Sequence, residues 1–296
     1  MKSQSQISKN ISGEWLILGA AVLWGTTGTS QALAPTSAHP ISVGLVRLAI
    51  GGVLLLAWAL FRGAFHGNGK WSFKAVALGG ICIATYQIFF FAGVARTGVA
   101  IGTMVAIGSA PIIAGLLDWL VQKERPSRKW VGATILAISG ALFLSGLLGQ
   151  DNKANIDLIG LLLAIGTGAS YAFYALASKQ LVQNHQPDAV MAVLFTLGAL
   201  LLLPFLFVVK INWLFEGQGL LVALHLGVIA TAVSYILFAR GLITVAVSTA
   251  VTLSLAEPLT AAILGIFVLG EPVSLMIAIG MGLIFAGLAL LSMKHR

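Results

Sequence analysis

Long apolar runs, separated by short polar connections, make up most of the sequence between residues 15 and 293. Runs such as 193–209 and 277–291 contain no charged residue. A transmembrane α-helix needs about 20 apolar residues, whereas a transmembrane β-strand alternates apolar and polar residues over about ten positions. The pattern therefore predicts membrane-spanning helices. We predict ten spans, at residues 15–34, 41–61, 74–94, 98–121, 129–148, 157–180, 188–209, 218–239, 242–269 and 273–293.

The composition supports this interpretation. Of the 296 residues, 58% are hydrophobic and only 9% are charged, and the mean hydropathy is +0.99. Soluble domains carry about 25% charged residues, so this chain cannot cover a water-soluble particle with polar surface. The composition excludes a soluble enzyme, a disordered chain and a fibrous repeat. The single cysteine, Cys82, excludes a disulfide framework.

The positive charges indicate an orientation in the membrane. The formal net charge is +8, and lysine and arginine are concentrated in alternate connections. With the N-terminus placed in the cytoplasm, thirteen of these residues fall inside and only Arg96, Lys153 and Lys210 fall outside. Cytoplasmic loops carry such an excess, so both termini are expected in the cytoplasm of a multi-pass inner-membrane protein. The basic charge is thereby explained without a nucleic-acid partner.

The sequence resembles itself at an offset of 147 residues, without a gap. We therefore predict two halves, 1–149 and 150–296, with five spans each. Five is an odd number, so the second half enters the membrane from the opposite face, as in the inverted repeats of secondary transporters. The expected fold is an all-α integral membrane protein of ten transmembrane helices in two inverted five-helix repeats. The scarce residues that match are Pro40 with Pro187, Pro111 with Pro258 and Glu124 with Glu271.

Several of these positions also resemble the EamA family of the drug/metabolite transporter superfamily. The resemblance implies ten helices and a central cavity lined mainly by spans 1, 3, 4, 6, 8 and 9, with spans 5 and 10 at the periphery. It also implies export of small metabolites, often amino acids. The first half departs from the pattern, because Lys123 precedes Glu124 where a glycine is common. The resemblance rests on Trp24-Gly25, Arg47, Pro111 with Glu124, and Glu257-Pro258 with Gly270-Glu271.

Glu257 is the leading candidate for a functional residue, because it lies near the middle of the ninth span. An acidic residue there costs about 2.5–3.5 kcal/mol on insertion scales. The following Pro258 lacks an N–H group and is expected to kink the helix, as Pro111 is in the fourth span. Glu257 could couple transport to protons or neutralise a substrate amine; the alternative is a structural glutamate that joins helices. Its counterpart in the first half is Ala110.

Other polar and aromatic residues at similar depth are expected to line the cavity. Arg47 lies in the outer third of the second span, where it could meet a substrate carboxylate, pair with a carboxylate or cap carbonyl groups. His225 could be a packing residue or a proton relay, and Asp118 is expected to be an interfacial charge partner. The remaining predicted cavity residues are Trp24, Tyr86, Gln87, Tyr171, Tyr174 and Tyr235.

Small residues recur at every fourth position in spans 5 and 10, in the stripes Ala133-Ala137-Ala141-Ser145 and Ala278-Gly282-Ala286. Such stripes let helices approach closely. They could serve packing within the chain or a contact between the two subunits of a homodimer.

The sequence contains no motif for catalysis or cofactor binding. The chain has no phosphate-binding G-x-x-x-x-G-K-[ST] motif, no histidine or cysteine cluster and no Ser/His/acid constellation. We therefore expect no enzyme activity, metal or cofactor. The sequence favours a secondary active transporter, an exporter of small metabolites such as amino acids. Broad efflux of amphiphiles or drugs, and metabolite uptake, are the alternatives.

Overall fold

A computed structural model describes residues 12–66, 69–145, 147 and 157–292 of the chain. This part is helical and contains no strand. Eight of its helices are long and apolar enough to cross a membrane. The predicted location of the termini and the boundary between the halves fall on residues outside the described part.

The helices of the first half follow the first five predicted spans to within a few residues. The fourth ends in a turn of π-helix, Asp118–Gln122. The others are α2 (Gly13–Ala32), α3 (Pro40–Phe61), α4 (Phe73–Thr97), α5 (Val99–Leu117) and α6 (Arg128–Leu144). Helices α2 and α6 are not among the eight apolar spans, so the count of ten remains a prediction.

The second half repeats this order with two interruptions. The eighth span consists of α9 (Gly219–Leu224), a π-helix (His225–Val233) and α10 (Ser234–Leu242). The ninth begins at Val247, five residues later than predicted, and is broken into α11 (Val247–Leu253) and α12 (Ala256–Leu269). The remaining elements are α7 (Leu158–Val182), α8 (Pro187–Leu206), a 3-10 turn (Asn212–Phe215) and α13 (Leu275–Ser292).

Two prolines and one aspartate mark the starts of three of the helices. Pro40 and Pro187 occupy the first turns of α3 and α8, where a missing N–H costs nothing. Asp157 caps α7, because its Oδ1 accepts the N–H of Gly160 at 2.8 Å, and its Oδ2 pairs with Arg96 at 3.2 Å. The Gly160 N–H and the Arg96 charge hold the pKa of Asp157 below its ordinary value.

The ends of α5 and α12 share one cap geometry at positions 147 residues apart. Lys123 and Gly270 both adopt left-handed backbone conformations, with φ of 62° and 72°. The N–H of Glu124 then bonds to the carbonyl of Asp118, and that of Glu271 to Gly265, each at 3.0 Å. The N–H groups of Lys123 and Gly270 bond to the same two carbonyls, so each carbonyl accepts two donors at a left-handed helix end. Lys123 therefore occupies the position at which glycine is usual and makes the same turn.

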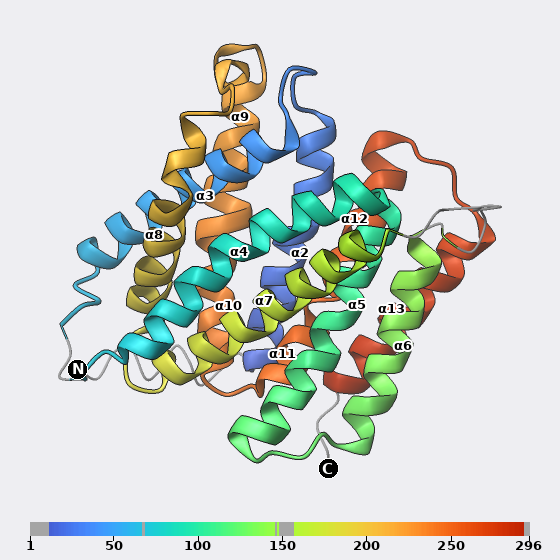
Figure 1. The fold of residues 1–296 in the computed structure, drawn as a ribbon. Coiled ribbons are helices and arrows are strands. Elements are labelled where there is room, and N and C mark those ends of the chain that lie inside the picture. The colour runs from blue at the N-terminus through green and yellow to red at the C-terminus, as the bar shows by residue number, and fades with distance from the viewer. Residues whose placement is uncertain (1–11, 67–68, 146, 148–156, 293–296) are drawn as a thin grey trace.

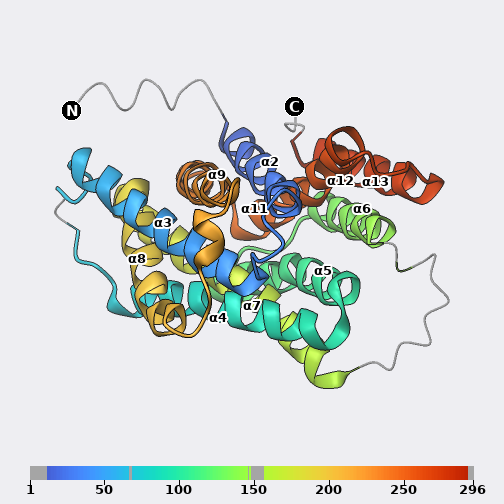
Figure 2. The same cartoon turned by 90° about the horizontal axis from the view of Figure 1, so that it is seen from above.

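Glycines bring helices from the two halves into close contact. Gly51 of α3 lies against Gly227 of the second half, and Gly198 of α8 lies against Gly80 of the first half. The two contacts correspond, because Gly198 lies 147 residues after Gly51 and Gly80 lies 147 residues before Gly227. Helix α4 packs on α7 and α3 packs on α8, so the halves interleave through the whole molecule (Figure 2).

Helices α6 and α13 form a pair at one edge of the molecule (Figure 1). Ala133, Ala137 and Ala141 are buried in this pair, so the first small-residue stripe serves packing within the chain. The second stripe does not, because Ala278, Gly282 and Ala286 are exposed on the outer face of α13. A homodimer contact there remains a prediction.

The α6–α13 pair generates a stability test. A Cβ on Gly140 would lie 2.6 Å from the carbonyl oxygen of Gly280, a backbone atom that cannot turn away. Overpacking costs about 1–3 kcal/mol, so Gly140→Ala is expected to lower the melting temperature of the purified protein by several degrees. Gly282→Ala is the control, since nothing lies within 4 Å of its added Cβ. Equal melting temperatures for both variants would contradict the packing described.

Candidate functional site

A cavity of about 360 Å³ lies at the centre of the helical assembly. Its lining comes from the helices that the family resemblance implies and, in addition, from α3 and α8. Neither α6 nor α13 contributes a lining residue.

The eight residues predicted for the cavity all line it. The structure brings together residues that are separated by up to 233 positions in sequence, because α2, α3, α4, α7, α10 and α12 all contribute to the lining. Sequence reasoning missed the cavity hydroxyls of Thr103, Thr167, Ser170 and Ser254. Serine and threonine are common in transmembrane packing, so no pattern distinguished them.

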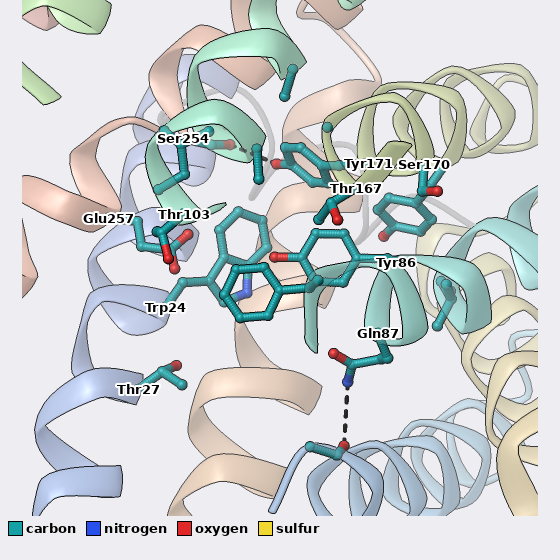
Figure 3. A pocket seen from close by; sticks show the side chains of 18 of the residues that line it. Trp24, Thr27, Tyr86, Gln87, Thr103, Thr167, Ser170, Tyr171, Ser254 and Glu257 are labelled. Atoms are coloured by element: carbon teal, nitrogen blue, oxygen red, sulfur yellow. Dashed lines mark hydrogen bonds between the residues drawn. The ribbon is translucent and has the colours of Figure 1, made fainter. Parts of the chain in front are cut away.

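Glu257 and Arg47 bring opposite charges into the same cavity. Glu257 follows the break between α11 and α12, and Arg47 projects from α3. The two charges are close enough to interact electrostatically, but they form no ion pair within 4 Å and no side-chain hydrogen bond with a described residue. In Figure 3, Thr103 and the hydroxyl of Tyr86 lie on the side of the cavity where Glu257 projects. The carboxylate and the guanidinium are therefore both available to a ligand.

A hydrogen bond joins the break in the ninth span to α7. The hydroxyl of Ser254 donates to the carbonyl of Ala250 at 3.0 Å, so Tyr171 donates to Ser254 Oγ at 2.7 Å (Figure 3). Pro258 has no N–H for the carbonyl of Ser254, which accepts the N–H of Glu257 instead. By contrast, α5 continues through Pro111.

Aromatic rings form one wall of the cavity. The ring of Trp24 lies 4.9 Å from that of Tyr235 and 6.3 Å from that of Tyr171, measured between centroids. Tyr174 belongs to the same wall, but its hydroxyl already donates to Met191 Sδ. The indole Nε1 of Trp24 is buried and has no partner in the described structure. An unpaired buried donor is unfavourable, so this nitrogen suits an acceptor on a ligand.

Two other predicted residues have packing roles. Gln87 Nε2 donates to the carbonyl of Gly44 at 3.3 Å, which ties α4 to α3 beside the cavity (Figure 3). His225 does not line the cavity; its Nε2 lies 2.9 Å from Thr26 Oγ1 and joins the π-helix to α2. Ala110, the counterpart of Glu257, also lines the cavity, so the two halves contribute unequally to it.

Two charged side chains fasten the segment between α10 and the start of α11. Lys179 Nζ donates to the carbonyls of Leu242 and Val245 at 2.7 and 3.0 Å. Asp118, which is 2% exposed, accepts the N–H of Ser248 at 2.7 Å. The sequence predicted that Asp118 is an interfacial charge partner, and this prediction is wrong. Asp118 is a buried acceptor that binds the start of α11. We call Asp118, Lys179 and the segment 242–248 the latch.

The cavity extends away from the latch. It reaches Gln31 near the end of α2, Gly44 near the start of α3 and Thr103 near the start of α5. Gly28, which also lines it, is exposed. The opening therefore lies at the end of the molecule that carries the connection between α2 and α3.

Comparisons with known proteins agree with this architecture. The EamA-like transporter family matches the chain twice, over residues 11–146 and 158–293. The uncharacterized transporter YwfM of Bacillus subtilis is 46% identical over 95% of this chain and 93% of its own length. The threonine/homoserine exporter RhtA of Escherichia coli K12 is 29% identical over 92% of this chain and 88% of its own.

A solved structure supports the fold. A crystal structure aligns with a TM-score of 0.79 at 22% sequence identity, covering 95% of this chain and 96% of the other. At this identity the likeness concerns the fold alone. The double match to the family, the related transporters and the apolar helices together give one conclusion: the chain is a multi-pass membrane protein of the EamA family, within the drug/metabolite transporter superfamily.

Proposed function

We propose that the protein is a secondary active exporter of small zwitterionic metabolites, such as amino acids, and that Glu257 couples export to protons. The observation that carries the proposal is the unpaired Glu257 and Arg47 within one cavity. A charge kept at membrane depth without a protein partner is costly unless it serves a ligand or an ion. The likeness to a threonine/homoserine exporter supports the same substrate class.

The cavity offers complementary groups to each part of an amino acid. Arg47 suits a carboxylate, because a guanidinium can hold both oxygens. Glu257 suits an ammonium group or a proton, but not both at once, and this competition would link the two fluxes. The rings of Trp24 and Tyr235 suit an apolar side chain. The same aromatic wall favours amphiphile or drug efflux as the second candidate, with uptake as the reverse direction.

We further propose that two inverted five-helix repeats, 1–149 and 150–296, exchange conformations during transport. The paired contacts Gly51–Gly227 and Gly198–Gly80, and the matching caps at Lys123 and Gly270, support this symmetry. With both termini in the cytoplasm, the opening beside the α2–α3 connection faces outward. The inward-open state would then close that end and release the latch.

The latch has no counterpart at the other end of the cavity. Offset by 147 residues, Asp118 corresponds to Gly265 and Lys179 corresponds to Ala32. The outer end therefore lacks counterparts of Asp118 and Lys179, and its own charged pair, Arg96 with Asp157, is partly exposed. This asymmetry would favour the outward-open state in the absence of substrate.

Proton coupling can be tested in vesicles. Inside-out vesicles with an acidic lumen are expected to accumulate labelled threonine, and Glu257→Gln to lose the stimulation by the pH gradient. The amide keeps the shape of the side chain but cannot carry the proton. Glu271→Gln, on the exposed loop before α13, is the control and is expected to keep the stimulation.

Two outcomes would redirect this proposal. Undiminished stimulation in Glu257→Gln would assign that residue to structure. Accumulation only in right-side-out vesicles would favour uptake, and accumulation of lipophilic cations without threonine would favour drug efflux.

The latch can be tested with Cys82, the sole cysteine, which lines the cavity. In Asp118→Asn, an impermeant thiol reagent applied to the cytoplasmic side is expected to modify Cys82 roughly tenfold faster, because a neutral amide oxygen accepts the Ser248 N–H more weakly than the carboxylate does. Asp157→Asn removes a capping carboxylate at the opposite end and is expected to leave this rate unchanged. Equal rates in wild type and Asp118→Asn would refute the latch.

A further inference from the structure

A second hollow, of about 290 Å³, lies on the outer surface of α5 and α6. It is separate from the central cavity and shares no lining residue with it. Ile112 and Ile135, on its two walls, are 54% and 60% exposed, so the hollow opens to the outside of the helical assembly. The lining residues are almost entirely apolar: Ile112, Gly115, Leu116, Trp119, Pro126, Trp130, Val131, Thr134, Ile135 and Ile138. We call this hollow the α5–α6 groove.

A basic loop borders one end of the α5–α6 groove. Lys123, Arg125 and Arg128 are exposed, and none forms an ion pair with a described residue. The loop contains one acid, Glu124. Pro126 and Trp130 belong to the same stretch and line the groove, so the positive charges lie where an apolar surface ends.

Trp130, which lines the groove, carries an unpaired hydrogen-bond donor. Its ring packs against Gly115, which leaves no room there for a Cβ. Its indole Nε1 is buried and has no partner in the described part of the chain. Tryptophan at a membrane interface presents an apolar ring to the acyl chains and its N–H to polar acceptors. An ester or phosphate oxygen would supply the missing acceptor.

The corresponding segment of the second half lacks all of these features. Residues 270–277, offset by 147, read Gly-Glu-Pro-Val-Ser-Leu-Met-Ile and contain no cation and no tryptophan. The basic loop and Trp130 are therefore not needed for the fold that the two halves share. They occur together in the first half alone.

We propose that the α5–α6 groove binds one anionic phospholipid. The headgroup phosphate would pair with Lys123, Arg125 and Arg128, an ester oxygen would accept the Trp130 N–H, and one acyl chain would lie in the groove. A zwitterionic lipid lacks the net charge that the loop favours, and free phosphate lacks the chain that the groove accommodates. The proposal rests on the membrane location of the protein and not on the direction of transport.

Native mass spectrometry of the full-length protein tests the proposal. With equal amounts of phosphatidylglycerol and phosphatidylcholine, the wild type is expected to retain phosphatidylglycerol preferentially. Arg125→Gln with Arg128→Gln is expected to lower that preference by about fivefold for each cation removed. The charge-matched control, Lys70→Gln with Lys74→Gln, changes exposed cations before and in the first turn of α4 and is expected to leave the preference unchanged.

Two further measurements separate the parts of the site. Trp130→Phe removes the indole N–H and is expected to lower phosphatidylglycerol retention, measured on variant protein whose folding is verified by its melting temperature. Glycerol 3-phosphate, a headgroup without chains, is expected not to displace the lipid. The proposal is overturned if wild type shows no preference, if both charge variants lose it equally, if Trp130→Phe retains it fully, or if glycerol 3-phosphate competes.

Discussion

A charge inside a hydrocarbon layer needs water, a counter-charge or a ligand, and this requirement governs the centre of the structure. Glu257 and Arg47 meet it by facing one cavity from different halves of the chain. The break before Glu257 is possible because Pro258 cannot continue the hydrogen-bond ladder and Tyr171 holds Ser254 beside the gap. The polar groups and the irregular backbone therefore lie where protein surrounds them and lipid does not reach.

The two halves share their packing but not their chemistry. The glycine contacts and the helix caps recur at an offset of 147 residues, whereas Glu257 is matched by Ala110 and Asp118 by Gly265. In the proposed mechanism, shared packing would give two related arrangements of similar energy, and unshared polar residues would decide which one is favoured. The π-helix Asp118–Gln122 illustrates this division, since Asp118 fastens the latch while its neighbour Trp119 lines the α5–α6 groove.

The sequence predicted the features that depend on composition and period. The positions of the long apolar helices, and with them the helices that carry Trp24, Tyr86 and Glu257, follow from where apolar runs begin and end. Features that depend on tertiary contact could not be predicted. Asp118 lies near the end of a span and looks like a surface charge, and only the fold shows that it caps α11. Likewise, no periodicity shows that one small-residue stripe is buried against α13 while the other is exposed.

The inverted arrangement of the halves is the claim on which the proposed mechanism rests, and sidedness tests it most directly. In a Cys82→Ser background, single cysteines would replace Glu124 and Glu271, which are exposed and 147 residues apart. The account predicts that an impermeant thiol reagent modifies position 124 only from the cytoplasmic side and position 271 only from the opposite side. Modification of both positions from the same side would contradict it.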